Sequence, residues 1–534
     1  METFASKPAP AGDKLRGGYY TPDLIARFLA DWVAEAGPRL LEPSCGDGGI
    51  LKHLAMRAPG GGVVGVELFE DEAAKAQQVS GASVFAEDFF SWFSGSRRGA
   101  FDGVAGNPPY IRFGSWEEAF RAPALDLMRG EGMRPTKLTN AWVPFVVASV
   151  LAVRPGGRVG LVLPAELLQV GYASALRAYL VDSCADITVV SFTRLVFPGI
   201  LQEVVLLLAE RGQGPARIRT IEVADAQSLG GVCITNSPTA RAHLHESEKW
   251  TQYYLEPDEI EVLRSVRTDG RLAPLLRYAE VDVGVVSGRN SFFCMTTAEA
   301  ADRGLLDVTV PIVSRSMQVP ALSLMPSEFA AQEKAGAKTR LLSVPAGFNL
   351  DDHPSLQRYL REGEEAGVQT GYKCRIRRSW WQVPSAWVPD GFMLRQISTH
   401  PRLTSNHVGA TSTDTVHRVR VRPDVEMDRL ATGAFNSATF ALAEVLGRSY
   451  GGGILELEPS EAEHLPVPDP SLVPHAIVAK ADELIRERRI EDALDLVDQT
   501  VLVDALNFDP AEVARLRDCW VRLRDRRSKR GRRG

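Results

Sequence analysis

Between about residues 15 and 212, short apolar segments alternate with segments of helical periodicity. The segments that we predict as strands are Arg39–Leu41, Val63–Glu67, Ser83–Ala86, Phe101–Ala105, Arg158–Leu163, Ile187–Phe192 and Glu203–Ala209. Helical patterns lie between most of them, at Pro22–Glu35, Gly48–Arg57, Glu70–Val79, Asn140–Val153 and Tyr172–Cys184. This alternation predicts a mainly parallel, doubly wound α/β sheet. The connection between the last two strands is too short for a helical crossover, so we expect that pair to be antiparallel.

The size and composition of the chain limit the classes of protein it can belong to. Its 534 residues suffice for two or three domains. The six scattered cysteines form no pattern for zinc or disulfides, so we predict no metal site and a reducing cytoplasm. We find neither a secretory signal nor an apolar run of the ~20 residues that span a bilayer, and therefore expect no membrane association. The net charge of −6 argues against indiscriminate coating of nucleic acid but allows a local basic cleft.

A glycine-containing loop follows the first predicted strand, in the string LLEPSCGDGGIL. Gly46, Gly48 and Gly49 allow the backbone to approach a ligand closely, and the following helix offers free N–H groups. The loop lacks both the G-x-G-x-x-G of dinucleotide folds and the Gly-Lys-Ser/Thr of a P-loop. Neither NAD nor a mononucleotide phosphate is therefore the expected ligand.

Acidic residues follow the next two strands. Glu67 ends the second strand, where a carboxylate can accept hydrogen bonds from both hydroxyls of a ribose. Asp88 follows the third strand and could accept from an adenine amine, with Phe89 beside the ring. The alternative is that these acids cap the helices behind them. Their placement at successive strand ends favours an adenosine pocket.

The tetrad Asn107-Pro108-Pro109-Tyr110 follows the fourth predicted strand. Two prolines stiffen the backbone and remove two N–H donors, which leaves a local excess of acceptors. The Asn107 side-chain oxygen and a neighbouring carbonyl could hold one exocyclic NH2 group, while Tyr110 stacks on a flat heterocycle. The alternative is a proline-rich turn with a structural tyrosine.

The order and spacing of YYTP, LEPSCGDG, VVGVEL, AEDFF, GNPPY and VFPGILQEVVLLL resemble the gamma-class (TaqI-like) N6-adenine DNA methyltransferases over roughly residues 17–210. The resemblance implies a seven-stranded fold with S-adenosyl-L-methionine as cofactor. It assigns Glu67 to the ribose and Asp88 with Phe89 to the adenine. The methionine end would be lined by Thr21, Glu42, Ser44, Cys45, Gly46, Asp47 and Gly48. We interpret Cys45 as a packing residue, not a nucleophile.

The same resemblance implies a reaction for the tetrad. Hydrogen bonds from an adenine amine to Asn107 and to the Pro108 carbonyl would aim the nitrogen lone pair at the cofactor methyl group. The base must first be flipped out of the duplex. Tyr110 would stack on one face, and Phe197 is a candidate for the other face or edge. For Phe197 the alternative is a core position.

The second half of the chain carries arginines interleaved with aromatic residues, as in CRIRRSWWQVPSAW. Arginine and asparagine suit contacts with base edges and phosphates. The predicted DNA-binding residues are Arg289, Asn290, Arg315, Arg375, Arg377, Arg378 and Trp380. The alternative for RIRRSWW is a solvated strand face with buried tryptophans. Two further strings in this half resemble segments of PstI-like adenine methyltransferases: HPRLTSNHVGATSTDTVHRVRV and AFNSATFALAEVLGRSYGGGILELEPSEAEHLPVP.

We therefore predict four parts. These are a flexible leader (1–14), a catalytic domain (15–215), a mixed α+β target-recognition domain (216–472), and C-terminal helices with a basic tail (473–534). For the tail RLRDRRSKRGRRG we favour a disordered solubilising segment over a phosphate-binding arm.

The whole pattern predicts a sequence-specific adenine methyltransferase acting on double-stranded DNA in a restriction–modification or other defence system. A partner endonuclease, if present, would be a separate chain, because we find no convincing nuclease motif. The alternatives are an enzyme that methylates protein glutamine or a guanine amine of ribosomal RNA, and a non-catalytic DNA-recognition subunit. The long second half argues against the first, and the intact motif series argues against the second.

Overall fold

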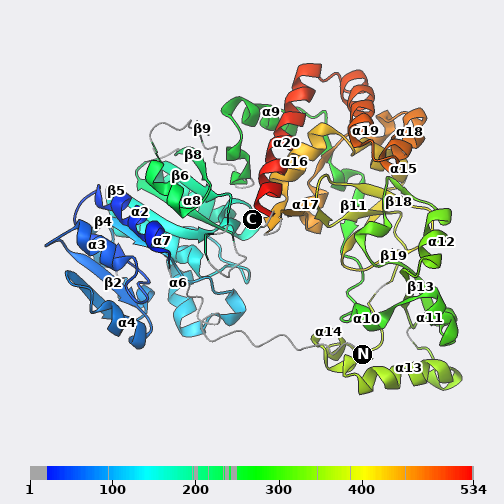
Figure 1. Ribbon diagram of the computed structural model, residues 1–534, viewed down its shortest axis with the longest axis horizontal. Coiled ribbons are helices and arrows are strands. Elements are labelled where there is room, and N and C mark those ends of the chain that lie inside the picture. The colour runs from blue at the N-terminus through cyan, green and yellow to red at the C-terminus, as the bar shows by residue number, and fades with distance from the viewer. Residues whose placement is uncertain are drawn as a thin grey trace. The chain divides into compact units, whose positions relative to one another are not determined.

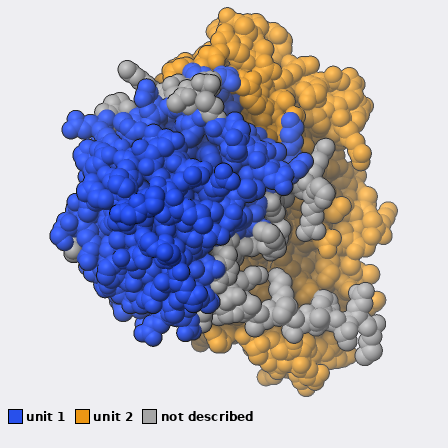
Figure 2. Space-filling view, turned by 60° about the vertical axis from the view of Figure 1, so that its left-hand side comes forward, with its two compact units in different colours: residues 1–257, 529–534 blue, residues 258–528 orange. Residues whose placement is uncertain are grey.

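A computed structural model describes residues 21–531 except 94, 195, 198–202, 214–215, 233, 235–239, 242–248, 346, 385 and 451–452. The predicted leader, residues 1–14, lies outside the described residues. The chain forms two compact units (Figure 2): unit 1 comprises residues 1–257 with 529–534, and unit 2 comprises residues 258–528. Among the described residues, no helix is both long and apolar enough to cross a bilayer.

Unit 1 is built on a nine-stranded sheet of order β3-β2-β1-β4-β5-β7-β6-β8-β9 (Figure 1). The strands are β1 (Leu40–Glu42), β2 (Val63–Glu67), β3 (Ala82–Ala86), β4 (Phe101–Gly106), β5 (Val153–Pro164), β6 (Cys184–Phe192), β7 (Val204–Arg211), β8 (Arg217–Val223) and β9 (Ala240–Arg241). The first five are parallel to one another. β7 runs antiparallel to both β5 and β6, which confirms the antiparallel pair expected from the short connection.

The strand order reverses beside β1. The chain moves outward from β1 to β2 and β3, and then returns to place β4 on the other side of β1. Such a reversal leaves a crevice at the carboxyl ends of the two central strands, where open α/β sheets bind ligands. The loops after β1 and β4, which carry the glycines and the tetrad, therefore belong to one edge of the sheet.

The helices of unit 1 correspond to the predicted helical segments. They are α2 (Asp23–Ala34), α3 (Leu51–Arg57), α4 (Glu70–Ala76), α7 (Trp142–Ala152) and α8 (Ser174–Ser183). All eleven residues of α7 are buried. Two helices were not predicted: α5 (Phe89–Trp92) and α6 (Glu118–Gly130), which contains Pro123.

A charge cluster joins the amino-terminal ends of the central strands. The Asp102 side chain, 5% exposed, accepts hydrogen bonds from the Arg39 guanidinium at 2.9 and 3.1 Å and from Arg154 Nε at 2.7 Å. Arg154 Nη2 also donates to the Ala36 carbonyl at 2.6 Å. The hydrogen bonds from Arg39 lower the pKa of Asp102 below its ordinary value. The cluster ties β1, β4 and β5 together at the end of the sheet opposite the glycine loop and the tetrad.

The sheet continues past residue 215, where we expected the catalytic domain to end. β8 pairs with β6 along seven residues, from Asp186–Arg217 to Phe192–Val223. Because hydrogen-bonded strands of one sheet share a core, the structure places the division at residue 257 instead and gives the sheet nine strands where seven were expected.

Unit 2 contains several small sheets and a set of helices. A five-stranded sheet has the order β11-β20-β16-β18-β14, and a four-stranded sheet has the order β12-β15-β13-β19. The first consists of β11 (Ala279–Asp282), β20 (Val416–Val421), β16 (Gly391–Leu394), β18 (Leu403–Asn406) and β14 (Ser323–Leu324). The second consists of β12 (Cys294–Thr296), β15 (Lys338–Leu342), β13 (Thr309–Val313) and β19 (Thr411–Ser412).

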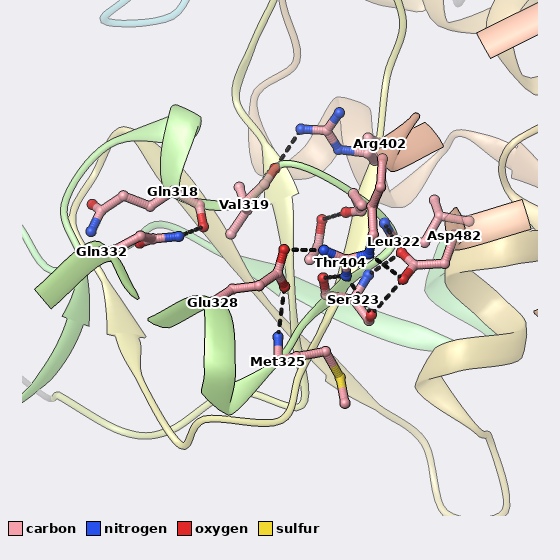
Figure 3. Close-up of polar contacts among 12 residues, drawn as sticks. Gln318, Val319, Leu322, Ser323, Met325, Glu328, Gln332, Arg402, Thr404 and Asp482 are labelled. Atoms are coloured by element: carbon pink, nitrogen blue, oxygen red, sulfur yellow. Dashed lines mark hydrogen bonds and ion pairs between the residues drawn. The ribbon is translucent and has the colours of Figure 1, made fainter. Parts of the chain in front are cut away.

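The longer helices of unit 2 are α9 (Pro257–Thr268), α13 (Pro354–Glu365), α16 (Ser437–Leu446), α18 (His475–Arg486) and α20 (Pro510–Gly531). α18 is hydrogen-bonded to the start of β14 through the side chain of Asp482 (Figure 3). Asp482 Oδ1 accepts from the backbone N–H groups of Leu322 and Ser323 at 2.8 and 3.0 Å, and Oδ2 accepts from the Ser323 hydroxyl at 3.0 Å. The C-terminal helices thus form part of unit 2, and no division appears at residue 473.

The basic tail is helical, which corrects our expectation of a disordered segment. α20 extends to Gly531, and the Arg527 side chain is 3% exposed. Its Nη2 lies 2.7 Å from Glu444 Oε1 on α16, and its Nη1 donates to the Ser398 carbonyl at 3.0 Å. A run of arginines in a sequence is typical of a solvated tail. Here one of them, Arg527, is buried and pairs with the buried carboxylate of Glu444.

Candidate active site

The loop after β1 adopts the backbone conformation that its glycines permit. Gly46 and Gly48 have φ values of +50° and +90°, in the left-handed region that favours glycine. The Gly48 N–H donates to the Cys45 carbonyl at 2.8 Å, and the Cys45 N–H donates to the Val66 carbonyl at 2.9 Å. Cys45 is 3% exposed, and burial raises the pKa of its thiol above the usual value. Cys45 is therefore placed to pack, since its thiolate form is disfavoured.

Glu67 holds this loop from the end of β2. Its Oε2 accepts from the Gly46 N–H at 2.8 Å, and its Oε1 accepts from the Phe69 N–H at 2.9 Å. Burial raises the pKa of Glu67, while these two backbone donors act in the opposite direction. Because each carboxylate oxygen has a second acceptor site, both can still accept from a ligand hydroxyl.

Glu42, the last residue of β1, presents an unusual buried group. It is 2% exposed, and its Oε2 has no hydrogen-bond partner among the described residues. Burial and then the neighbouring Glu67 charge raise its pKa well above the ordinary value. A buried polar atom of this kind is costly unless a ligand supplies a donor or a positive charge. The loop after β1 is thus lined by acceptors suited to a ligand with hydroxyl, ammonium or other cationic groups.

The tetrad after β4 lies against this loop and against Thr21. The Ser44 hydroxyl lies 3.4 Å from the Asn107 carbonyl oxygen, and Asn107 Nδ2 donates to Thr21 Oγ1 at 3.2 Å. The Tyr110 hydroxyl lies 3.0 Å from Asn107 Oδ1 and 3.1 Å from the Val162 carbonyl of β5. In the described part of the chain, the Pro108 carbonyl accepts no backbone hydrogen bond. The structure thus brings together Thr21, the loop after β1 and the tetrad.

The residues after β3 have a structural role in the described chain. Asp88 caps α5, because its Oδ1 accepts from the Ser91 N–H at 2.8 Å and from the Ser91 hydroxyl at 3.0 Å. Phe89 is 3% exposed and stacks on Phe145 with ring centroids 5.3 Å apart. Asp88 therefore acts as a helix cap, as the alternative interpretation proposed. Only its second carboxylate oxygen, Oδ2, is left for a ligand.

Phe197 lies in the hydrophobic core of unit 1. It is 6% exposed and belongs to a cluster with Val190, Phe192 and Leu206. Its neighbours Leu195 and 198–202 lie outside the described residues. The core alternative therefore describes the position of Phe197.

The predicted DNA-binding residues of unit 2 separate into two groups. Four side chains hold local structure. Arg377 Nη2 donates to the Val286 and Ser287 carbonyls at 2.7 and 2.9 Å, and Arg289 Nη1 donates to the Ala366 carbonyl at 3.0 Å. Asn290 Oδ1 accepts from the Ser287 hydroxyl at 2.5 Å. Trp380 Nε1 donates to Glu364 at 3.2 Å, and its ring packs on Phe292.

The other three, Arg315, Arg375 and Arg378, are exposed. In the part of the chain that the structure describes, none of the three makes a side-chain hydrogen bond or ion pair. Arg375 ends the short helix α14 (Tyr372–Arg375), and residues 376–381 continue as turns and bends, so the RIRRSWW segment is not the strand face that we considered as the alternative. The three exposed arginines remain available to phosphates.

Sequence reasoning missed a turn close to the tetrad, formed by residues 134–140. The Ala141 N–H at its end donates at 3.0 Å to the carbonyl of Ile111, the residue after Tyr110. The available signal was a polar string, RPTKLTN, before a largely apolar helix. That string does not reveal which residue the turn contacts.

Two families of known proteins match parts of this chain. Residues 64–197 match the family described as Eco57I restriction-modification methylase, and residues 247–502 match the C-terminal domain of type II methyltransferase M.Eco57I. Type II methyltransferase M.XamI of Xanthomonas campestris pv. amaranthicola is 24% identical over 472 residues, covering 85% of each chain. M.AccI of Acinetobacter calcoaceticus is 20% identical and covers 83% of each.

A solved structure supports the fold. The type IIL restriction-modification enzyme MmeI in complex with DNA matches with a TM-score of 0.56 and 11% identity, covering 94% of this chain and 75% of that one. A likeness at this identity bears on the architecture alone. It agrees with the overall architecture described above.

Proposed function

We propose, from the premise that this chain belongs to the DNA methyltransferases of restriction–modification systems, that it methylates the N6 amine of an adenine flipped out of duplex DNA. The observation that carries this proposal is the contact of the tetrad with Thr21 and with the loop after β1, where the strand order reverses. There Asn107 bonds Thr21 at 3.2 Å, and Ser44 of the loop after β1 lies against the tetrad. A methyl donor in that loop and an amine at the tetrad would therefore be neighbours.

The residues of the loop after β1 fit S-adenosyl-L-methionine. The partnerless Oε2 of Glu42 suits a positively charged group, and both Glu67 oxygens can accept from ribose hydroxyls while they hold Gly46 and Phe69. An ideal Cβ on Gly46 would meet nothing within 4 Å, which indicates open space at the loop. Asp88 would accept from the adenine amine through Oδ2, and the buried Phe89 would support that wall from behind. When bound, this cofactor supplies an electrophilic methyl group.

The tetrad then prepares the amine. We assign the two acceptors to Asn107 Oδ1 and the Pro108 carbonyl, which together orient one NH2 group and draw electron density toward its nitrogen. The Tyr110 hydroxyl is fixed between Asn107 and Val162, so its ring is preorganised to stack on a flipped base. Since Phe197 belongs to the core cluster, stacking is assigned to Tyr110 alone.

The duplex would be held by unit 2 through its exposed arginines, Arg315, Arg375 and Arg378. Arg377, Arg289, Asn290 and Trp380 would act indirectly, by fixing the loops that present them. A modification enzyme acts where host DNA lies, so we propose a cytoplasmic location and a separate restriction endonuclease that shares its recognition sequence.

Single-molecule sequencing of DNA from cells that express the protein tests this proposal. We expect N6-methyladenine at one sequence motif, and none in cells that express Asn107→Ala. Methylation of a different base would refute the adenine assignment. A protein that modifies no DNA but labels protein glutamine or ribosomal RNA with radioactive methyl groups would refute the DNA assignment.

A further inference from the structure

A rigid turn beside the tetrad exposes a leucine. In residues 134–140, the Thr136 N–H donates to Thr139 Oγ1 at 2.9 Å, and the Leu138 N–H donates to Thr136 Oγ1 at 3.2 Å. Thr139 is 2% exposed, whereas the Leu138 side chain at the tip is 74% exposed. Two side-chain hydrogen bonds thus hold an apolar side chain in water. Single exposed leucines are common on protein surfaces, so the role of Leu138 depends on the residues near it.

The turn is anchored at its C-terminal end, next to the proposed target site. The Ala141 N–H donates to the Ile111 carbonyl at 3.0 Å, and Ile111 directly follows Tyr110. Ala141 then leads into α7, all of whose residues are buried. Three residues span at most ~11 Å, so the Leu138 Cα lies within that distance of the Ala141 Cα. Leu138 therefore lies three residues before the hydrogen bond that ties the turn to the residue after Tyr110.

Cationic residues accompany this leucine: Arg134 and Lys137 lie four and one residues before it, and Arg112 follows Ile111. Arg112, Arg134 and Lys137 are exposed, and none makes a side-chain hydrogen bond or ion pair within the described residues. Most acidic side chains of the same stretch are engaged elsewhere, in the pairs Glu118–Arg121, Asp126–Arg129 and Glu131–Arg98. An apolar tip accompanied by exposed cations that have no partner among the described residues suits a ligand with apolar faces between rows of phosphates.

We propose that Leu138 is a wedge that enters duplex DNA beside the target base, with Arg112, Arg134 and Lys137 on the flanking phosphates. This inference rests on the proposed function and deepens it. A flipped base leaves exposed base faces in the duplex, and an apolar side chain that covers them favours the open state. The wedge lies in the same unit as Asn107, so extrusion and capture of the base would both be performed by unit 1.

The test uses the full-length protein and a duplex that carries the mapped recognition sequence, with 2-aminopurine in place of the target adenine to report extrusion. We expect Leu138→Ala to lose most of the fluorescence increase and to lower kcat/KM on a paired adenine by about tenfold or more. A mismatch opposite the target removes the pairing that the wedge must break. On that duplex, Leu138→Ala should come within about threefold of the wild type. Leu138→Phe should retain activity on both.

The matched control is Met56→Ala, since Met56 is also exposed (69%) in unit 1 but belongs to α3; it should behave as the wild type. Equal rates of Leu138→Ala and wild type on the paired duplex would overturn the wedge. So would an equal loss on the paired and mismatched duplexes, because that pattern indicates a general defect. A wild type that methylates neither duplex would instead refute the proposed function.

Discussion

The two units of this protein gather their functional residues in different ways. In unit 1, predicted residues at the ends of three strands meet at one edge of a sheet, with Glu67 bonded to Gly46 and Ser44 against Asn107. In unit 2, Arg377 and Arg375 are two positions apart, yet one is bonded to backbone carbonyls and the other is exposed. Parallel strands bring their carboxyl ends together by construction. No comparable rule determines which side chains are exposed on a surface that is built from short loops.

The largest effect should come from the tetrad in unit 1. Asn107→Ala removes a preorganised acceptor, so we expect methyl transfer to fall at least ~100-fold, as for the loss of one preorganised hydrogen-bonding group in other enzymes. Cofactor affinity measured by calorimetry should change little. Asn349→Ala, at an exposed turn of unit 2, is the control and should be fully active. Turnover near the wild-type value in Asn107→Ala would refute the assignment of the tetrad.

The next effect concerns the charge cluster under the unit 1 sheet. Asp102→Asn should lower the free energy of unfolding by about 2 kcal/mol at pH 7, because it weakens charge-assisted bonds to Arg39 and Arg154. Since Arg39 lowers the pKa of Asp102, this contribution is present above the ordinary aspartate pKa. It is lost as the pH falls through the lowered value, so denaturant unfolding of the variant and of the wild type should converge in acid.

The control for that cluster is an exposed pair in unit 2. Glu280 and Arg422 lie 2.9 Å apart with side chains 51% and 44% exposed, so Glu280→Gln should cost well under about 1 kcal/mol. If Glu280→Gln lost more free energy of unfolding than Asp102→Asn, the exposed pair of unit 2 would be the stronger one, contrary to this prediction.

A smaller effect is expected at the proposed ribose site. Glu67→Gln keeps the shape of the side chain but removes its charge and one acceptor site, so cofactor affinity should weaken by about tenfold, or 1.4 kcal/mol. Calorimetric titration with S-adenosyl-L-methionine measures this. Glu70→Gln, at the exposed start of α4, should leave affinity unchanged. Unaltered binding by Glu67→Gln would remove the ribose assignment.

The smallest effect should separate the two groups of arginines in unit 2. Arg375→Gln with Arg378→Gln should weaken DNA binding severalfold and reduce the slope of log K against log salt by up to about 1.8, with stability unchanged. Arg377→Gln should instead lower the unfolding temperature, because it loses bonds to the Val286 and Ser287 carbonyls. Titrations at several salt concentrations distinguish them. If Arg377→Gln alone altered the salt slope, Arg377 would be the phosphate contact, and Arg375 with Arg378 would not be.

Most of unit 1 could be predicted because its signals are local. All seven expected strands and five expected helices form, since apolar runs and helical periodicity reflect each element's own burial. The strands β8 and β9 were missed because the Gly/Pro-rich stretch before them resembled a domain boundary. The tail was mistaken for disorder because only the fold supplies Glu444 as the partner of Arg527.

The sequence by itself determined the kind of site: a glycine loop, strand-end acids and an acceptor-rich tetrad, in an order that a doubly wound sheet brings to one edge. Only the tertiary structure decided which side chains are free to act. It showed Thr21 bonded to Asn107, Asp88 engaged as a helix cap, Phe197 in the core, and Leu138 exposed three residues before the Ala141–Ile111 hydrogen bond. The physical reason is that residue type and spacing reflect local conformation, whereas the availability of a side chain depends on the partners that the fold brings to it.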